Sequence, residues 1–435
     1  MTTALADLVA AAPGTLVVPV RPRGASVDVP TPLCLLDALE LGAGRWVGVV
    51  EDGDGERWTV PLVVDAAGVR RAVAGDGVAA ALVHALRNDG RTGSFAIDAW
   101  HSEDVAGERA VTVDQTNDSI VVGERAVVKW CVRLPPAGVT GAQPAAARLA
   151  TLEAQGFSGT PRPWGLLRFT GGAETLLLAS IAEFLPGALD GWDWAVDDVR
   201  RFARGETTSR DALSPATRLG RLTAQLHVAL ASGGRDAADD RLVARWTARA
   251  YDDLDAVVQL VDGPEGVRLR ARSGRIAASF GAFRDCVGTP LSDVHGDLHV
   301  GQVLRHGDPV AYAVTDFDGN PVLAPGERSA RQPAALDVAG MLASLDHVGR
   351  VVVRRTDGVD PDVVRAWISA AQAAFLDEYR DTLGRNGSGD LLDERLLAPL
   401  RLQQECREFL YAVHHLPHWR YVPDAALVDL LPDEE

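Results

Sequence analysis

The hydrophobic pattern of the sequence changes near residue 195 from strand-like to helix-like, and this change limits the folds that the chain can form. Before it, short runs rich in β-branched residues alternate with Gly and Asp turns, as in "TLVVPV" (15–20), "RWVGVV" (45–50) and "RWTVPLVV" (57–64). Such runs predict strands, and the alanine-rich "GVAAALVHALRN" (77–88) predicts a helix. We therefore expect a small α+β unit at the N-terminus.

A second β-rich segment follows, with "RAVTV" (109–113), "SIVVGERAVVKWCVRL" (119–134) and "ETLLLASIAEFL" (174–185). A helix is expected between these strands, at about 143–155. Beyond residue 195 the pattern is that of amphipathic helices, one of which we expect to open at the Ser214-Pro215 dipeptide. Strand-like sequence returns only in "VLRHGDPVAYAVTDFDG", and "GRNGSGD" predicts a loop between helices.

Composition narrows the class of protein. The chain has 435 residues, of which 47% are hydrophobic, enough for substantial cores. No run of eighteen or more apolar residues occurs and the N-terminus lacks the basic start of a secretory signal, so we expect a cytoplasmic protein. Four scattered cysteines predict reduced thiols. A net charge of −17 argues against nucleic acid and favours a cationic small molecule. We expect a monomer with no membrane partner.

The stretch "AVVKW" (126–130) holds the chain's single lysine, Lys129. The other 42 of the 43 basic side chains are arginine. One interpretation is an accident of an arginine-rich composition. The other is that this position requires a compact ammonium, whose point charge a planar guanidinium does not reproduce.

Two neighbouring motifs carry the residues best suited to chemistry, "DVHGDLHVGQVL" (293–304) and "AVTDFDG" (313–319). A loop, a short hairpin and a carboxylate at its far end would gather Asp297, Gln302 and Asp316 around one cavity. Phosphoryl transfer needs such a set, with one carboxylate to accept the proton of the attacking hydroxyl. An amide oxygen and a second carboxylate are hard ligands of the kind that Mg²⁺ prefers.

These motifs resemble the catalytic and metal-binding motifs of aminoglycoside-phosphotransferase-like kinases, with Gln302 at the position of the usual metal-binding Asn, as in maltokinases. "QTNDSIVVGERAVVKW" and "AEFLPGALDGW" (182–192) are also similar to maltokinases, and the C-terminal "QQECREFLYAVHHLPHWRYVPD" is similar to actinobacterial glucosamine kinases. The resemblance covers most of the chain. It implies a bilobal, eukaryotic-protein-kinase-like α+β fold with an N-terminal cap (1–105), a nucleotide-binding part with the hinge (106–186) and a helical C-lobe (187–435).

The resemblance assigns nucleotide-binding roles in the strand-rich part. Lys129 falls where kinases of this fold keep the lysine that binds the α- and β-phosphates of ATP, and Ser119 belongs to the polar loop that replaces a glycine-rich one. "SIAEF" resembles the adenine-binding hinge, with Glu183 and Phe184 acting through their main chain. Kinases pair the lysine with a glutamate of the following helix. Here Glu153 lies near the end of the expected helix, so its pairing with the lysine stays open.

Other side chains near the motifs have structural interpretations. His295 and His299 have a spacing that suits zinc on a helix, but no third ligand is evident, so we expect His295 to brace the catalytic loop. We interpret Asp337, at the start of a helix, as structural support. A group of six aromatic residues predicts core packing with one exception, Trp419, a candidate sugar platform; the others are Trp192, Trp194, Phe409, Tyr411 and Tyr421.

The C-terminal helix suggests the substrate. Glu405 and Glu408 lie three residues apart, so on a helix they share a face and could both point into a sugar cavity. Two solvated acids are the alternative. The resemblance to glucosamine kinases, with Trp419 just beyond the helix, favours acids that pair the 2-ammonium of glucosamine.

Three functions are therefore weighed. The resemblance implies an ATP- and Mg²⁺-dependent sugar kinase that converts glucosamine to glucosamine 6-phosphate, with Asp297 as the base. A maltokinase or an aminoglycoside phosphotransferase of the same fold is the second. A nucleotide-binding pseudokinase is the third, and the presence of Asp297 and Asp316 argues against it.

Overall fold

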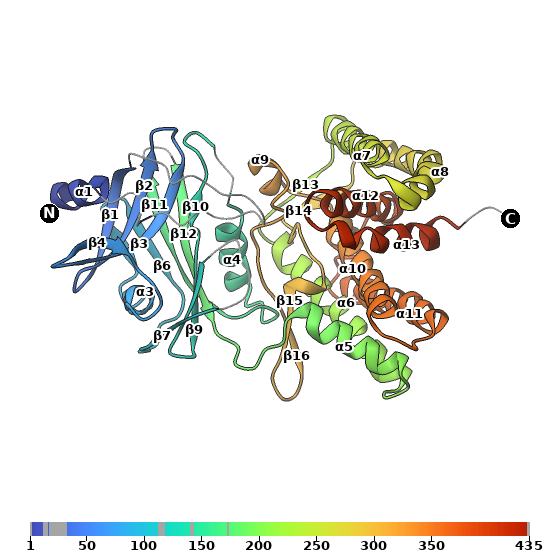
Figure 1. The fold of residues 1–435 in the computed structure, drawn as a ribbon, viewed down its shortest axis with the longest axis horizontal. Coiled ribbons are helices and arrows are strands. Elements are labelled where there is room, and N and C mark those ends of the chain that lie inside the picture. The colour runs from blue at the N-terminus through green and yellow to red at the C-terminus, as the bar shows by residue number, and fades with distance from the viewer. Residues whose placement is uncertain are drawn as a thin grey trace. The chain divides into compact units, whose positions relative to one another are not determined.

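The computed structural model describes residues 2–11, 16, 33–111, 118–139, 143–171 and 174–432. The chain divides into two compact units, which are described separately. The N-terminal unit comprises residues 1–153, 160–186 and 321–329, and the helical unit comprises 154–159, 187–320 and 330–435. Figure 1 labels the elements of both. The expected boundary at residue 105 inside the N-terminal unit stays a prediction.

The N-terminal unit contains a five-stranded antiparallel sheet in which β3 pairs with β2, β4 and β10. Its strands are β1 (Leu33–Gly42), β2 (Arg45–Asp52), β3 (Arg57–Asp65), β4 (Gly68–Arg71) and β10 (Arg133–Leu134). The two strands predicted from "RWVGVV" and "RWTVPLVV" are confirmed as β2 and β3, whose centres are buried. The strand predicted at 15–20 lies outside the described residues except for Leu16, which is buried.

A seven-stranded antiparallel sheet carries the predicted nucleotide-binding residues, in the order β5-β6-β11-β12-β9-β8-β7. Its strands are β5 (Gly90–Thr92), β6 (Phe95–Ala99), β7 (Glu108–Ala110), β8 (Asp118–Val122), β9 (Ala126–Trp130), β11 (Pro163–Gly171) and β12 (Glu174–Glu183). Helix α4 (Ala145–Ala154) confirms the helix predicted between these strands. Helices α1 (Thr2–Ala11) and α3 (Val78–Ala85) complete the unit, and α3 confirms the alanine-rich helix.

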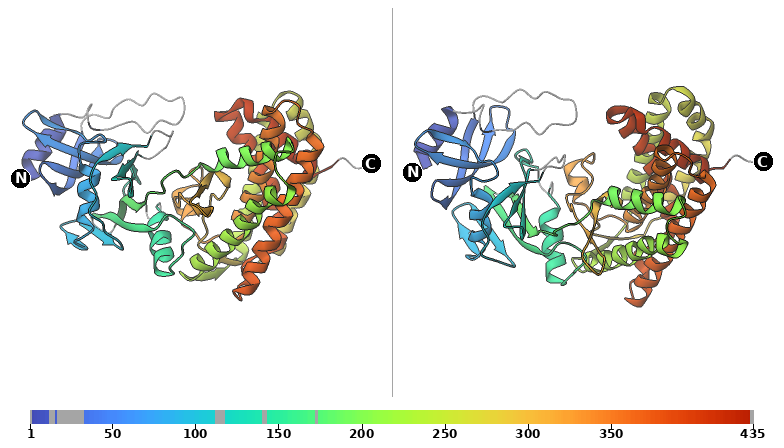
Figure 2. Two further views of the ribbon diagram at one scale, coloured as in Figure 1. Left: turned by 90° about the horizontal axis from the view of Figure 1, so that it is seen from below. Right: turned by 60° about the horizontal axis from the view of Figure 1, so that its bottom comes forward.

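The helical unit packs a bundle whose buried side chains come from helices far apart in sequence. The longer helices are α5 (Gly191–Ala203), α6 (Ser209–Ala231), α7 (Asp240–Leu260), α8 (Gly263–Phe280), α10 (Ala335–Arg355), α11 (Pro361–Arg385), α12 (Leu397–His415) and α13 (Tyr421–Leu430). Helices α6 and α11 run along one another, as two further views show (Figure 2). The loop predicted at 384–390 separates α11 from the short helix η3 (Gly389–Leu391).

The expected start of one helix at Ser214-Pro215 is wrong. Helix α6 begins at Ser209, and Pro215 lies inside it. Thr208 is the N-cap, because its hydroxyl accepts a hydrogen bond from the amide of Asp211. The real cap lies seven residues, about two turns, before the proline.

The helical unit contains two small antiparallel pairs. β13 (Arg235–Ala237) pairs with β14 (Pro290–Ser292), just before the first motif. β15 (Val303–His306) and β16 (Ala311–Val314) form the hairpin predicted between the two motifs. Among the residues that the structure describes, no helix is both long and apolar enough to cross a membrane.

Candidate active site

We call the loop between β14 and β15, residues 293–302, the catalytic loop. Its backbone amides donate hydrogen bonds to side chains of α10. Asp337, in the first turn of α10, accepts from the amides of His295 (2.7 Å) and Gly296 (2.8 Å). Farther along, the amide of Val300 donates to the hydroxyl of Ser344 at 3.1 Å. Asp337 therefore has the structural role predicted for it, since it fixes the backbone immediately before Asp297.

His295 braces the same loop from inside. Its Nε2 lies 2.8 Å from the carbonyl oxygen of Thr315, and its Nδ1 accepts from the amide of Asp297 at 3.3 Å. Because a carbonyl oxygen only accepts, the Nε2 nitrogen carries a proton. These contacts agree with a bracing role, and they tie the catalytic loop to the residue that precedes Asp316.

The carboxyl group of Asp297 is held in a site that disfavours its charge. Burial raises its pKa to about 7, with further increases from the charges of Asp316, Asp337 and Glu408, while Arg407 works in the opposite direction. A carboxylate whose pKa lies near 7 is well matched to proton transfer at neutral pH. The same repulsion favours a cationic ligand beside Asp297.

Gln302 and Asp316 are brought together by the hairpin. The β15–β16 register ends at Val303 and Val314, and one step beyond it the amide of Thr315 donates to the carbonyl oxygen of Gln302 at 2.8 Å. Asp316 follows with φ of 65°, in the left-handed region that non-glycine residues rarely occupy. Such backbone strain is typical of functional positions. The structure therefore places the two predicted metal ligands close together.

A tryptophan of α5 lies against the catalytic loop because two glycines permit close approach. A Cβ built on Gly191, the first residue of α5, would lie 1.7 Å from the carbonyl oxygen of Val300, and one on Gly301 would lie 2.8 Å from Nε1 of Trp192. Trp192 in turn makes an edge contact with Trp419, at 5.9 Å between ring centroids. The core position predicted for Trp192 is wrong, because its side chain is partly exposed beside the catalytic loop, and no local pattern indicates this position.

His299 has a partner that leaves little reason to invoke zinc. Its Nδ1 accepts from the amide of Gly301 at 3.1 Å. Burial lowers its pKa to about 4, with a smaller decrease from His295. The imidazole is therefore neutral at pH 7 and stabilises the turn into Gln302.

Glu408 is the acid of α12 that combines partial exposure with polar neighbours. Its Oε2 accepts from Nε1 of Trp419 at 3.2 Å, and its Oε1 accepts from the side-chain amide of Gln404 at 3.1 Å. Because Glu408 also contributes to the raised pKa of Asp297, the two carboxylates belong to one electrostatic environment. The structure brings Asp297, Glu408 and Trp419 into the same part of the helical unit.

Glu405 has a partner that sequence reasoning missed. Its two oxygens lie 3.2 and 3.0 Å from Nε2 of His347 on α10, and its side chain is fully buried. Burial lowers the pKa of His347, but the charge of Glu405 outweighs burial and raises it to about 9. His347 therefore already pairs with Glu405, and the prediction that Glu405 and Glu408 both point into a sugar cavity stays a prediction.

Phe409 and Trp194 lie in the core as predicted, whereas the core prediction is wrong for Tyr411. Phe409 is fully buried, and Nε1 of Trp194 donates to the carbonyl oxygen of Val303 at 2.9 Å. Tyr411 is exposed beside His415. The ring of Tyr421 contacts Trp419.

In the N-terminal unit, the predicted phosphate-binding residues lie on adjacent strands. Ser119 of β8 is directly opposite Lys129 of β9, and Lys129 is directly opposite Ser180 of β12. Directly opposed residues of antiparallel strands project their side chains on the same face. The strand position predicted for Lys129, near the end of β9, is confirmed.

The backbone amides of the two predicted hinge residues, Glu183 and Phe184, already donate hydrogen bonds within the N-terminal unit. The amide of Glu183 donates to the carbonyl oxygen of Arg162, and that of Phe184 donates to the carbonyl oxygen of Arg125, both at 2.8 Å. The ring of Phe184 also lies under the guanidinium of Arg109, at 5.0 Å. An adenine contact at this segment would therefore use backbone groups other than these two N–H donors.

Helix α4 buries an arginine, Arg148, and carries Glu153 near its end. Arg148 is 1% exposed and donates to the carbonyl oxygen of Arg328, at the end of α9 (Pro325–Arg328). Glu153 lies near the C-terminal end of α4 and is partly exposed. The pairing of Glu153 with Lys129 stays open.

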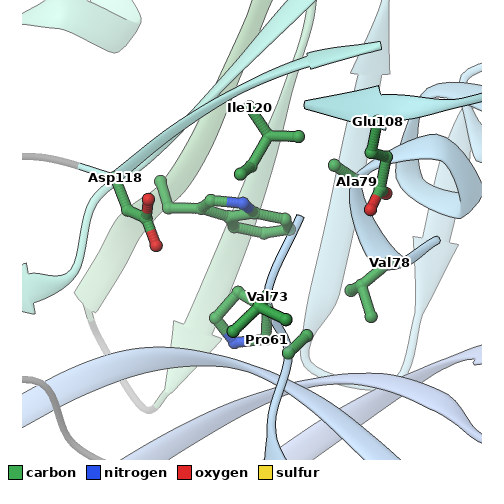
Figure 3. A pocket seen from close by; sticks show the side chains of 9 residues that line it. Pro61, Val73, Val78, Ala79, Glu108, Asp118 and Ile120 are labelled. Atoms are coloured by element: carbon green, nitrogen blue, oxygen red, sulfur yellow. The ribbon is translucent and has the colours of Figure 1, made fainter. Parts of the chain in front are cut away.

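A small hollow in the N-terminal unit, lined by both sheets and by α3, does not suit a substrate (Figure 3). Its volume is about 10 Å³, room for roughly one water molecule. Its two acids are already engaged, since Glu108 accepts from the amides of Gly75, Gly77 and Ala80, and Asp118 pairs with Arg71.

The chain is similar over its whole length to two glucosamine kinases. It is 58% identical to that of Streptacidiphilus jiangxiensis over 437 aligned positions, covering 100% of this chain and 99% of the relative. It is 43% identical to that of Mycolicibacterium smegmatis, covering 92% and 98%. No family model matches.

Solved structures lead to the same group. A glucosamine kinase in complex with glucosamine, ADP and inorganic phosphate is 57% identical, with a TM-score of 0.88 over 98% of this chain and 99% of that one. A crystal form of glucosamine kinase aligns with a TM-score of 0.89 over the full length of both chains. The predicted α+β class is thereby confirmed, and the chain belongs to the glucosamine kinase family.

Proposed function

We propose that this protein transfers the γ-phosphoryl group of ATP to the primary 6-hydroxyl of glucosamine, with Asp297 as the general base. The observation that carries the proposal is the catalytic loop, in which Asp337 and His295 fix the backbone around a carboxyl group whose pKa lies near 7. A hydroxyl within hydrogen-bond reach of Asp297 would be oriented for attack and would lose its proton as the new bond forms.

The donor set fits Mg²⁺. Gln302 supplies an amide oxygen and Asp316 a carboxylate, and the hairpin register keeps them adjacent. Magnesium prefers a few hard oxygen ligands, completed by water and phosphate. When bound, the ion would neutralise charge on the phosphates of ATP. If Asp316 is a ligand, Asp316→Asn should raise the Mg²⁺ concentration needed for half-maximal rate, and a defect that excess Mg²⁺ leaves unchanged would remove the assignment.

In the N-terminal unit, Lys129 is proposed to bind the α- and β-phosphates, with Ser119 beside it. A compact ammonium suits oxygens of two neighbouring phosphates, because its three donors are not confined to one plane. Glu183 and Phe184 are proposed to contact adenine through their main chain. The relative bound to ADP and inorganic phosphate supports a nucleotide donor.

The charges around Asp297 support an amino sugar as acceptor. Glu408 is partly exposed and lies near Asp297, so it can pair the 2-ammonium of glucosamine while Nε1 of Trp419 holds its other oxygen. Glu405 is buried and paired with His347. Glucose would leave Glu408 without a cationic partner, and N-acetylglucosamine has no charge at that position. Trp419 is proposed as the wall against which the ring packs.

A substrate panel tests the proposal. We would compare kcat/KM with ATP and Mg²⁺ for glucosamine, glucose, N-acetylglucosamine, maltose and an aminoglycoside, and locate the new phosphate ester by ³¹P–¹H NMR. Glucosamine should be preferred and should carry the phosphate on C6. Glu408→Gln should lower that preference more than Glu405→Gln. A faster reaction with maltose or an aminoglycoside would favour the corresponding alternative kinase, and no ADP release with any acceptor would favour a pseudokinase.

A further inference from the structure

A buried chain of hydrogen bonds leads from α11 to the catalytic loop. The hydroxyl of Tyr379 lies 2.7 Å from Nδ1 of His227 on α6, and Nε2 of the same imidazole lies 3.0 Å from Oδ2 of Asp337. All three side chains are 0–1% exposed. The chain ends on the two amides that Asp337 accepts immediately before Asp297.

The packing of α6 against α11 fixes the start of this chain. A Cβ built on Gly220 of α6 would lie 2.2 Å from the carbonyl oxygen of Phe375 on α11, so a side chain there would push the helices apart. The rings of Phe375 and Tyr379 are nearly parallel, with centroids 6.2 Å apart. The ring of Tyr379 meets that of His227 edge-on at 5.6 Å. This packing places the hydroxyl of Tyr379 within hydrogen-bond distance of Nδ1 of His227.

The direction of each hydrogen bond in this series follows from the residues at its two ends, Tyr379 and Asp337. Burial raises the pKa of Tyr379 well above its ordinary value, so the hydroxyl keeps its proton. Burial favours the neutral form of Asp337, but hydrogen bonds from His227 and from the amide of Gly296 help to lower its pKa, so the group is a carboxylate that accepts. A neutral imidazole that accepts at Nδ1 carries its proton on Nε2, the nitrogen that faces this carboxylate.

We propose that Tyr379 is a positioning residue for the reaction. Its hydroxyl donates to Nδ1 of His227 and fixes the orientation of the imidazole whose Nε2–H bonds Asp337, and Asp337 in turn holds the loop that carries Asp297. Without the hydroxyl, Nδ1 would be a buried acceptor with no donor, and the ring could turn away from its hydrogen bond to Asp337. The loop would then lose part of its support, although every group that touches substrate is still present. This inference rests on the role proposed for Asp297.

Tyr379→Phe is the kinetic test, with Tyr251→Phe as the matched control. Tyr251, on α7, donates its hydroxyl to the carbonyl oxygen of Ala277 at 3.0 Å, so that control removes one tyrosine hydrogen bond away from the chain. We expect kcat of Tyr379→Phe to fall about tenfold, less than the ~10²-fold cost of a 1 Å misplacement. KM for ATP and for the acceptor should change by less than about twofold. A wild-type kcat, or an equal loss in Tyr251→Phe, would overturn the proposal.

Two further measurements separate positioning from a general loss of structure. If Tyr379 acts through His227, then adding Tyr379→Phe to His227→Gln should change kcat by less than about twofold, because residues in one network are not additive. Additive losses would contradict the proposal.

Nitrogen-15 NMR of the His227 imidazole needs no substrate, so it also distinguishes failure of this inference from failure of the proposed kinase activity. The wild type should show a protonated Nε2 and an Nδ1 that accepts a hydrogen bond, and Tyr379→Phe should move the Nδ1 resonance because its donor is lost. An unchanged spectrum would reject the positioning role, whatever the enzyme phosphorylates.

Discussion

Exposed ion pairs occur in both units, and the helical unit also has pairs that are almost completely buried. Arg109–Glu124 and Arg133–Glu56 are exposed pairs of the N-terminal unit, with side-chain exposures of 50% and 58%, and 62% and 33%. His227–Asp337 is completely buried, and His347–Glu405 is 4% and 1% exposed. Exposed pairs are worth little, whereas removing one member of a buried pair leaves a charge without compensation.

The contrast follows the proposed chemistry. The buried pairs of the helical unit are attached to the catalytic loop or to the helix that carries Glu408. Between them lies Asp297, whose charge is disfavoured by its neighbours. A charge that is poorly compensated in the free protein can be compensated by a cationic substrate or by a proton in transfer. The charge of Asp297 therefore lowers the stability of the helical unit, and the proposed reaction uses that same charge.

The largest loss of stability should follow Asp337→Asn. The new amide would place N–H groups against the donors of His227, His295 or Gly296, and it would remove the buried negative charge. We expect the free energy of unfolding to fall by about 3–5 kcal/mol, the cost typical of breaking a buried pair. Urea unfolding at pH 7 measures it. A loss below that of an exposed pair would mean that the interior charges are not coupled as described.

The second effect is a pH dependence of stability from His347. Its pKa is about 9 in the folded protein against an ordinary value of 6.5, so the charged form stabilises the fold fully below pH 6.5. That contribution is lost as pH rises through 9, for a total of about 3 kcal/mol. Thermal unfolding between pH 6.5 and 9 should show the loss in the wild type.

Glu405→Gln is the matched variant for that experiment. It removes the largest contribution that raises the pKa of His347, so that pKa should fall, although the charges of Glu408 and Asp346 still oppose burial. Its stability should change less across this range than that of the wild type. Parallel pH curves for the two proteins would show that the pair does not titrate as proposed.

A smaller effect is expected from Lys129→Arg in the N-terminal unit. The substitution keeps the charge but spreads it over a planar group, so one charge-assisted hydrogen bond to phosphate should be misaligned. We expect kcat/KM for ATP to fall about tenfold, equivalent to ~1.4 kcal/mol. Arg133→Lys is the reciprocal control on an exposed pair. Equal kinetics in wild type and Lys129→Arg would indicate that the single lysine reflects composition alone.

The smallest effect should come from an exposed pair itself. Arg133→Gln removes the partner of Glu56 at the surface of the N-terminal unit. The free energy of unfolding should change by less than about 1 kcal/mol. A loss comparable with that of Asp337→Asn would erase the difference between the two units.

The part of the candidate site that was predictable is contiguous in sequence. Asp297, Gln302 and Asp316 lie within 20 residues and are joined by a hairpin, so one local fold decides their proximity. Directly paired strands likewise place Ser119 beside Lys129. Helical periodicity correctly put Glu405 and Glu408 on α12, but each acid's partner depends on packing.

The features that sequence reasoning missed depend on long-range contacts. His347 is 58 residues from Glu405, and Tyr379 is 152 residues from His227. No local sequence pattern indicates that a distant histidine neutralises Glu405 and not Glu408. The start of α6 was missed for a different reason, because Thr208 and Pro215 both resemble helix starts and only the backbone decides between them.

Asp297→Asn, assayed for both turnover and stability at pH 8, tests the central claim most directly. The folded pKa of Asp297 is about 7 against an ordinary 3.8, so above pH 7 its charge opposes folding, and the uncharged amide should not. We predict that kcat with glucosamine falls by about 10²–10⁴-fold, while the unfolding temperature at pH 8 stays the same or rises. A variant with near-wild-type turnover, or one that loses activity only because it unfolds at a lower temperature, would contradict this account of Asp297.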